Sequence, residues 1–205
     1  EPTPMWSTQV LIEQPELVRE VHAEYFRAGA TLATTNTYSV LRDRLEREGL
    51  ENRLEALWAT AVQAACNARD AHGSGRVAGA IGPLVGSYRP EACPPPEQAE
   101  ILYADIVAAL APSVDLLLFE TMSSVAQAEG ALRAASKAAL PVWLAISVDD
   151  VDGTRLRSGE PLIALAPMLQ RSAPAALLIN CSLPEVVTAG LDIVATFGTP
   201  FGAYA

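Results

Sequence analysis

The chain has 205 residues, of which half are hydrophobic and 19% are charged. This composition is typical of a globular protein with one sizeable core and argues against a disordered chain. The net charge is −10 and Lys137 is the single lysine, so the basic surface that nucleic-acid binding needs is missing. No apolar run reaches the roughly 20 residues of a membrane span, and the first residues lack the features of a signal peptide.

The cysteines are three in number: Cys66, Cys93 and Cys181. An odd and sparse set is a poor framework for disulfides and agrees with a reducing compartment. We therefore expect a protein of the cytoplasm, with no membrane or nucleic-acid partner.

Helical and strand-like segments alternate along the chain. The first helix is predicted by apolar residues at helical spacing (Leu17, Val21, Tyr25), with Gly29 as its cap. We expect helices over 14–28, from about 40 to 72 with a break at Gly49, and over 97–111, 123–139, 161–171 and 183–197. We expect strands over 31–38, 77–81, 115–119, 141–148, 175–179 and 200–204.

This alternation predicts a parallel α/β fold with right-handed crossovers. Two architectures fit it, a doubly wound sheet and a (β/α)8 barrel, and hydrophobic periodicity does not choose between them. Six strands are too few to close an eight-stranded barrel. Because no linker or composition shift interrupts the pattern, we expect residues 1–205 to form a single domain.

Polar residues at the carboxyl ends of the predicted strands are the candidates for function, because chemistry collects there in parallel α/β folds. The first group is Thr34–Tyr38, where Thr35 and Asn36 could line a ligand or simply complete a strand and its turn. The second is Gly82-Pro83, where glycine could admit a ligand to the backbone or merely end a strand.

Glu120 directly follows the apolar segment 115–119. A carboxylate at the mouth of a buried strand is costly unless it is paired, so it could hold a ligand amine or act as an acid or base. The alternative is that it stabilises the start of the next helix, a role for which Thr121 and Ser123 compete.

Cys181 follows the predicted strand 175–179 within Asn180-Cys181-Ser182. It could be a small buried residue, a nucleophile or a ligand for a soft metal. A nucleophilic cysteine usually needs a histidine nearby, but His22 and His72 fall within a helix and at a helix end. Zinc needs three or four ligands, which one cysteine does not supply.

Taken in order, five segments resemble the homocysteine S-methyltransferase family. They are AGATLATTNTY (28–38), VAGAIGP (77–83), DLLLFETM (115–122), PVWLAISV (141–148) and ALLINCSLPE (176–185). The resemblance covers essentially the whole chain and implies a (β/α)8 TIM-type barrel, here lacking the first and last strands. The family's Asp-Gly-Gly segment and its Gly-Gly-Cys-Cys motif do not occur in this sequence.

The resemblance implies zinc-dependent transfer of a methyl group from a sulfonium-type donor, S-methylmethionine or S-adenosylmethionine, to the thiol of homocysteine, giving methionine. It implies that Cys181 is one zinc ligand, with the other ligands expected outside this chain, and that no side chain acts as acid or base. Glu120 would bind the homocysteine ammonium group, and Thr35, Asn36 and Asn180 would line the substrate. Tyr88 could face the cationic methyl group of the donor.

Two alternatives remain open at this point. One is the homocysteine-activating module of a cobalamin-dependent methionine synthase. The other is a zinc-free barrel that binds an amino acid without catalysis. With one zinc ligand of three, residues 1–205 by themselves are expected to be inactive.

Overall fold

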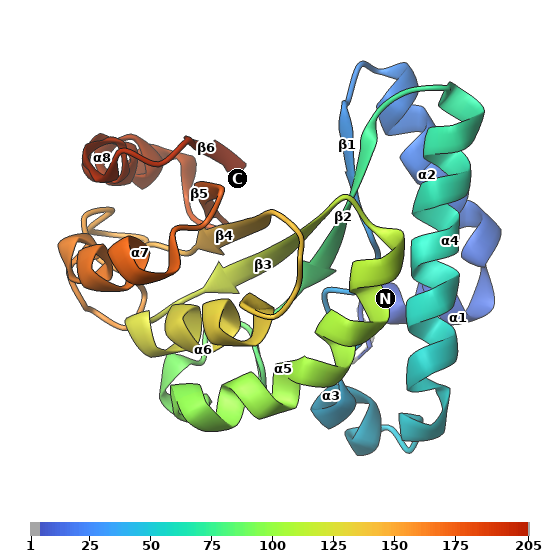
Figure 1. The fold of residues 1–205 in the computed structure, drawn as a ribbon, viewed down its shortest axis with the longest axis horizontal. Coiled ribbons are helices and arrows are strands. Elements are labelled where there is room, and N and C mark those ends of the chain that lie inside the picture. Colours follow the sequence, from blue (N-terminus) through green and yellow to red (C-terminus); the bar gives the residue numbers. More distant parts are fainter. Residues whose placement is uncertain (1–4, 205) are drawn as a thin grey trace. The chain divides into compact units, whose positions relative to one another are not determined.

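The computed structural model describes residues 5–204 and shows helices alternating with strands, which confirms the α/β class (Figure 1). The helices are α1 (Ser7–Glu13), α2 (Pro15–Arg27), α3 (Arg42–Arg47), α4 (Leu54–His72), α5 (Pro96–Leu110), α6 (Val125–Ala135), α7 (Ala166–Ser172) and α8 (Pro184–Val194). The strands are β1 (Leu32–Thr34), β2 (Arg76–Ile81), β3 (Leu116–Met122), β4 (Val142–Ile146), β5 (Ala176–Asn180) and β6 (Phe201–Tyr204). None of the helices in this described range is long and apolar enough to cross a membrane.

The six strands form one sheet in which neighbours follow the chain order, β1 to β6. The pairs β1–β2, β4–β5 and β5–β6 are parallel, with Leu177 opposite Phe201 and Asn180 opposite Tyr204 in the last pair. A doubly wound sheet reverses its strand order at a switch point, whereas a (β/α) barrel keeps chain order throughout. The order is therefore consistent with part of a TIM-type barrel.

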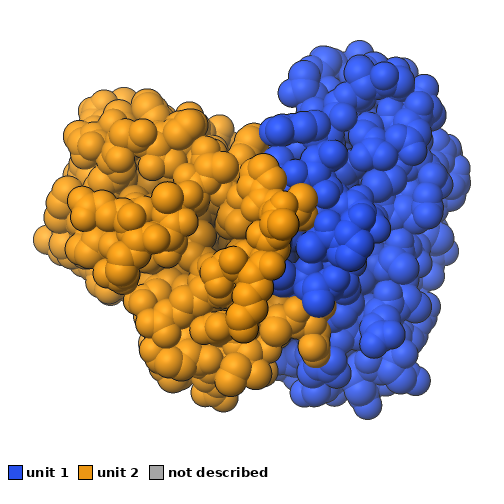
Figure 2. All heavy atoms as spheres, in the orientation of Figure 1, with its two compact units in different colours: residues 1–82, 106–118 blue, residues 83–105, 119–205 orange. Residues whose placement is uncertain are grey.

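Two compact units are distinguished by their internal contacts, and Figure 2 colours them separately. Unit 1 comprises residues 1–82 and 106–118, and unit 2 comprises residues 83–105 and 119–205. The organisation of 1–205 as a single domain stays a prediction.

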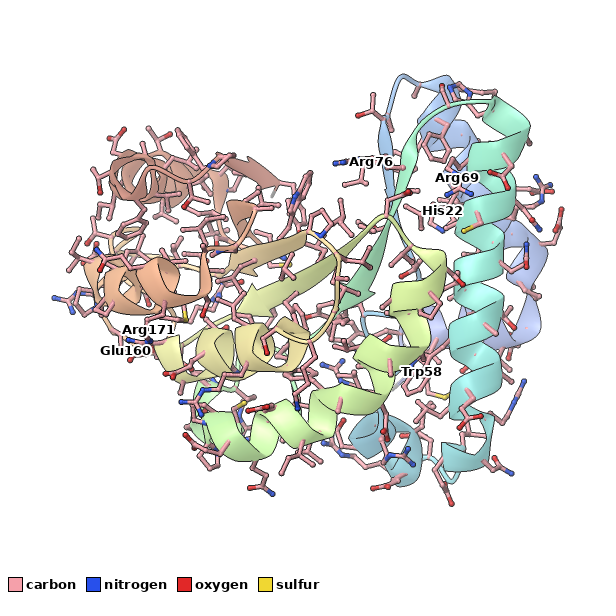
Figure 3. All side chains as sticks on the ribbon, in the orientation of Figure 1. His22, Trp58, Arg69, Arg76, Glu160 and Arg171 are labelled. Carbon is pink, nitrogen blue, oxygen red and sulfur yellow. The ribbon has the colours of Figure 1, made fainter. Side chains whose placement is uncertain are left out.

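Unit 1 is built around α2 and α4, which lie side by side (Figure 1). The buried face of α4 carries small and large apolar residues at helical spacing, among them Leu57, Trp58, Ala61 and Ala65. The indole N–H of Trp58, labelled in Figure 3, donates to the carbonyl oxygen of Val40 at 2.7 Å, so this buried ring leaves no polar atom unpaired.

Unit 2 holds the later strands and the helices that pack on them. Tyr103 and Phe119 meet edge to face with 5.4 Å between ring centroids, and the Tyr103 hydroxyl accepts a hydrogen bond from the Leu84 amide. Helix α6 begins after Ser124, whose hydroxyl accepts from the Gln127 amide. The Glu160 carboxylate, labelled in Figure 3, also accepts a bond at this helix start, from the Val125 amide.

Several element boundaries differ from the prediction for identifiable reasons. Strand β3 continues to Met122, whose carbonyl oxygen accepts from the Ser147 amide, so Glu120 lies within the strand and not after it. Helix α6 is capped by Ser124, and not by Thr121 or Ser123, the two candidates that competed with Glu120 for that role. Helix α1 was not predicted, and β1 ends early, at Thr34.

Candidate functional site

The ends of β3 and β5 meet in unit 2 around three polar residues: Thr121, Asn180 and Cys181. The Asn180 side-chain oxygen accepts from the Thr121 amide at 3.1 Å, and its Nδ2 donates to the Thr121 hydroxyl at 3.0 Å. An amide N–H can only donate, so this pairing fixes which end of the Asn180 side chain carries the oxygen. Both residues are essentially buried, at 0% and 1% exposed.

The Cys181 sulfur lies beside this pair. It accepts from Nδ2 of Asn180 at 3.4 Å and from the Thr121 hydroxyl at 3.5 Å, while the cysteine itself is half-buried. Two donors therefore point at one sulfur atom. The Cys181 sulfur is thus held in place by side chains from β3 and β5.

Thr121 and Cys181 both have left-handed backbones, with φ of 64° and 51°. L-residues other than glycine seldom adopt this region, and a β-branched threonine there is a clear outlier. Such conformations persist only where surrounding bonds hold them, and they concentrate at functional sites. Two such residues, one close to the end of β3 and one directly after β5, mark this point as specialised.

The backbone next to Cys181 is held by serine hydroxyls. The Asn180 carbonyl oxygen accepts from the hydroxyls of Ser147 and Ser182, each at 2.9 Å. The Ser182 hydroxyl in turn accepts from the Val148 amide at 3.0 Å. The position of Cys181 is thus tied to the end of β4.

Glu120 is half-buried, and one of its carboxylate oxygens accepts from the Tyr204 hydroxyl at 2.7 Å. Burial raises the pKa of Glu120, because the charged form loses hydration, and the bond from Tyr204 opposes this by lowering it. Tyr204 lies opposite Asn180 in the β5–β6 register. Unit 2 therefore presents a half-buried carboxylate close to the end of β3 and a hydrogen-bonded thiol directly after β5.

The family model described as homocysteine S-methyltransferase matches residues 1–205. The chain belongs to the homocysteine S-methyltransferase family. This agrees with the resemblance carried by the five sequence segments and with the strand order of the sheet.

Relatives within the homocysteine S-methyltransferase family support this membership. The chain is 34% identical to the homocysteine S-methyltransferase of Escherichia coli (strain K12), over 92% of this chain and 66% of that protein. It is 29% identical to homocysteine S-methyltransferase YbgG of Bacillus subtilis (strain 168), over 87% of this chain and 62% of that protein. The chain thus spans somewhat less than two thirds of the length of these relatives.

Solved structures of the homocysteine methyltransferase MmuM from Escherichia coli resemble the fold closely. The metallated form gives a TM-score of 0.88 at 31% identity, covering 98% of this chain and 76% of that one. The apo form gives 0.73 at 26% identity, covering 96% and 82%. Of these two forms of MmuM, the metallated one is the more similar.

A zinc site of the kind that the homocysteine S-methyltransferase family implies is not complete among residues 5–204. Within that range no three His, Cys, Asp or Glu side chains are grouped so that they could hold a metal ion. Cys181 has the donor chemistry for zinc. Cys66 belongs to unit 1, where its thiol donates to the Ser113 carbonyl oxygen at 3.5 Å. The described residues therefore do not by themselves form a site that fits the metal.

The other residues predicted for a homocysteine S-methyltransferase site, Thr35 and Asn36, lie in unit 1. The Thr35 hydroxyl accepts from the Ala80 amide and pairs with the Thr37 hydroxyl, which donates to the Ala80 carbonyl oxygen. Thr35 thus fastens the end of β1 to β2. Asn36 is half-buried and donates to the Ser7 carbonyl oxygen at 3.1 Å.

The space beside Gly82 is also filled by the protein itself. A Cβ at this position would lie 2.4 Å from the Tyr38 carbonyl oxygen, so packing accounts for the glycine. Tyr88 was expected to face the cationic methyl group of the methyl donor. Arg157 covers one face of its ring, with the guanidinium carbon 4.6 Å from the ring centroid.

Sequence reasoning missed the roles of Thr121 and Tyr204. Thr121 directly follows Glu120, so its place at a strand end was readable, but its left-handed backbone was not. Tyr204 lies 84 residues from Glu120, and no local pattern signals their contact.

Proposed function

We propose that this protein transfers a methyl group from a sulfonium-type donor, S-methylmethionine or S-adenosylmethionine, to the sulfur of homocysteine, giving methionine. The observation that carries the proposal is the thiol of Cys181, hydrogen-bonded by Thr121 and Asn180 in a chain of this family. Glu120, which bonds to Tyr204, directly precedes Thr121 in the same strand. We propose further that the six strands are part of a (β/α)8 barrel and that the enzyme works on small molecules in the cytoplasm.

Glu120 binds the ammonium group of homocysteine in this proposal. Burial disfavours its charged form, and an ammonium ion is the partner that would offset this cost. Anchoring the amino group orients the substrate sulfur, and such positioning supplies much of the rate in two-substrate reactions. Thr35 and Asn36 are proposed to line the substrate. Asn36 is the better candidate, because the Thr35 hydroxyl already bonds to Thr37 and Ala80.

Cys181 is proposed as a zinc ligand that acts together with ligands outside residues 5–204. When bound, zinc would hold the homocysteine sulfur as thiolate at neutral pH. Asn180 and Thr121 aim the Cys181 sulfur, since their donors point at it. The Asn180 amide is fully engaged in this way, so we propose that it positions Cys181 more than it contacts substrate.

The methyl transfer needs little acid or base catalysis. The homocysteine sulfur forms a bond to the methyl carbon as the bond to the donor sulfur breaks. The electron pair stays on the donor, which leaves as a neutral thioether, and the thiol proton is released. A site without a nearby histidine suffices for this chemistry, and we assign no side chain as general acid or base.

The test is methionine formation by the complete protein with each sulfonium donor, in wild type and in Glu120→Gln. We expect Glu120→Gln to raise the KM for homocysteine by about tenfold or more, as expected for the loss of a charge-assisted bond, while bound metal is retained. Glu185→Gln, which changes an exposed carboxylate on α8, should behave as wild type.

Two outcomes would contradict parts of this proposal. Methyl transfer that requires cobalamin would favour the homocysteine-activating module of a methionine synthase. An unchanged KM in Glu120→Gln would remove Glu120 from the site.

A further inference from the structure

The loop after β4 carries an arginine whose backbone is firmly anchored. The Arg157 amide donates to the Ser147 carbonyl oxygen at 3.2 Å, and the Ser158 amide donates to the Ser123 carbonyl oxygen at 3.0 Å. These bonds attach the loop to the ends of β3 and β4. The Arg157 side chain therefore starts from a fixed point.

Arg157 forms a two-pronged ion pair with Asp150 in the same loop. Its Nη1 and Nη2 lie 2.9 Å and 2.8 Å from the two carboxylate oxygens. The side chain of Arg157 is only 21% exposed, and its guanidinium also lies over the Tyr88 ring. Two parallel bonds and a covered guanidinium face fix this arginine more firmly than a single-point contact does, while the Asp150 side chain is 40% exposed.

Both partners of this pair also bond to the backbone that contains Cys181. Nη2 of Arg157 donates to the Cys181 carbonyl oxygen at 2.9 Å. The Leu183 amide donates to an Asp150 carboxylate oxygen at 3.3 Å. The ion pair thus spans residues 181 to 183 and holds one peptide group on each side of Ser182.

We propose that Asp150 and Arg157 are a positioning pair that clamps the Cys181 turn in its left-handed conformation and so aims the thiol at Asn180 and Thr121. A non-glycine residue leaves this conformation unless outside bonds hold it. Arg157 supplies such a bond at the cysteine's own carbonyl, and Asp150 supplies the next one along the chain. The importance of the clamp for catalysis rests on the proposed function, but the clamp itself is testable without substrate or metal.

The test measures alkylation of Cys181 by iodoacetamide in reduced, metal-free protein, using peptide mass spectrometry. Cys66 and Cys93 in the same sample serve as internal references. Loss of the clamp lets the Cys181 thiol leave its two donors and turn toward solvent. In Arg157→Gln we expect the alkylation rate of Cys181, relative to Cys66, to rise about tenfold, the factor for one charge-assisted bond lost from the closed state.

The opposite charges of the two partners separate a clamp from simple electrostatics. The two single variants remove charges of opposite sign, so charge effects alone move the alkylation rate in opposite directions in Arg157→Gln and Asp150→Asn. The clamp predicts that both single variants, and the double variant, accelerate alkylation. Asp152→Asn is the matched control, because it breaks the exposed pair between Asp152 and Arg155 in the same loop.

The expected result is a rise in all three variants that break the clamp and no change in Asp152→Asn. Arg157→Lys should resemble Arg157→Gln, because an ammonium group lacks the fork that joins Asp150 to the Cys181 carbonyl oxygen. An unchanged ratio in Arg157→Gln, opposite shifts in the two single variants, or a wild-type ratio in Arg157→Lys would each overturn the proposal. The alkylation ratio does not depend on methionine formation. A protein that forms no methionine would therefore contradict the proposed function without contradicting the clamp.

Discussion

Asn180→Ala tests whether the paired amide between β3 and β5 is the structural support of the site. The substitution removes the acceptor for the Thr121 amide and the donor to the Thr121 hydroxyl and the Cys181 sulfur. The Thr121 N–H would lose its hydrogen-bond acceptor in a fully buried place, which costs about 1–3 kcal/mol of folding stability. The other lost bonds add about 1 kcal/mol net.

The free energy of unfolding should therefore fall by about 2–4 kcal/mol, a large share of the 5–15 kcal/mol typical of a folded protein. Urea denaturation followed by circular dichroism measures this. At a slope of about 2 kcal/mol per M, the midpoint should move down by about 1–2 M.

The matched control is Asn36→Ala, which removes one hydrogen bond from a half-buried asparagine and should cost less than about 1 kcal/mol. If Asn180→Ala destabilises the protein no more than Asn36→Ala does, the hydrogen bonds between Asn180 and Thr121 are not the structural support of the site.

Three further predictions concern Glu120, Tyr204 and Gly153. Because the pKa of Glu120 is raised on folding, its contribution to stability is lost as pH rises above its ordinary value of 4.5, so Glu120→Gln should gain stability over wild type in that range. Unfolding curves from pH 4 to pH 8 measure this difference, and a constant difference would contradict it. Tyr204→Phe removes the bond that lowers the pKa of Glu120, so a carboxyl NMR titration should show it higher still, and a lower value would refute the contact. Gly153→Ala should cost about 1–3 kcal/mol in thermal unfolding, because its Cβ would lie 2.0 Å from the Val186 carbonyl oxygen, whereas Gly86→Ala, with its nearest neighbour at 3.7 Å, should be close to neutral.

Much of the fold follows from local patterns in the sequence. Apolar spacing predicts α2 and α4, and buried apolar runs predict β2 to β5, because each pattern records which side of an element faces the core. Polar residues that interrupt or follow these runs single out Glu120, close to the end of β3, and Cys181, directly after β5. Short-range chemistry thus determined which residues to consider and the class of fold that carries them.

The tertiary structure decided how these residues are used. The bonds that define the site join Thr121 to Asn180 across 59 residues, Glu120 to Tyr204 across 84, and Arg157 to Cys181 across 24. No local window contains both partners of such a bond. The left-handed backbones of Thr121 and Cys181 are likewise imposed from outside, since neither residue favours that conformation by itself. Hydrogen bonds with Asn180 on β5 and with the loop after β4 supply the contacts at these two residues.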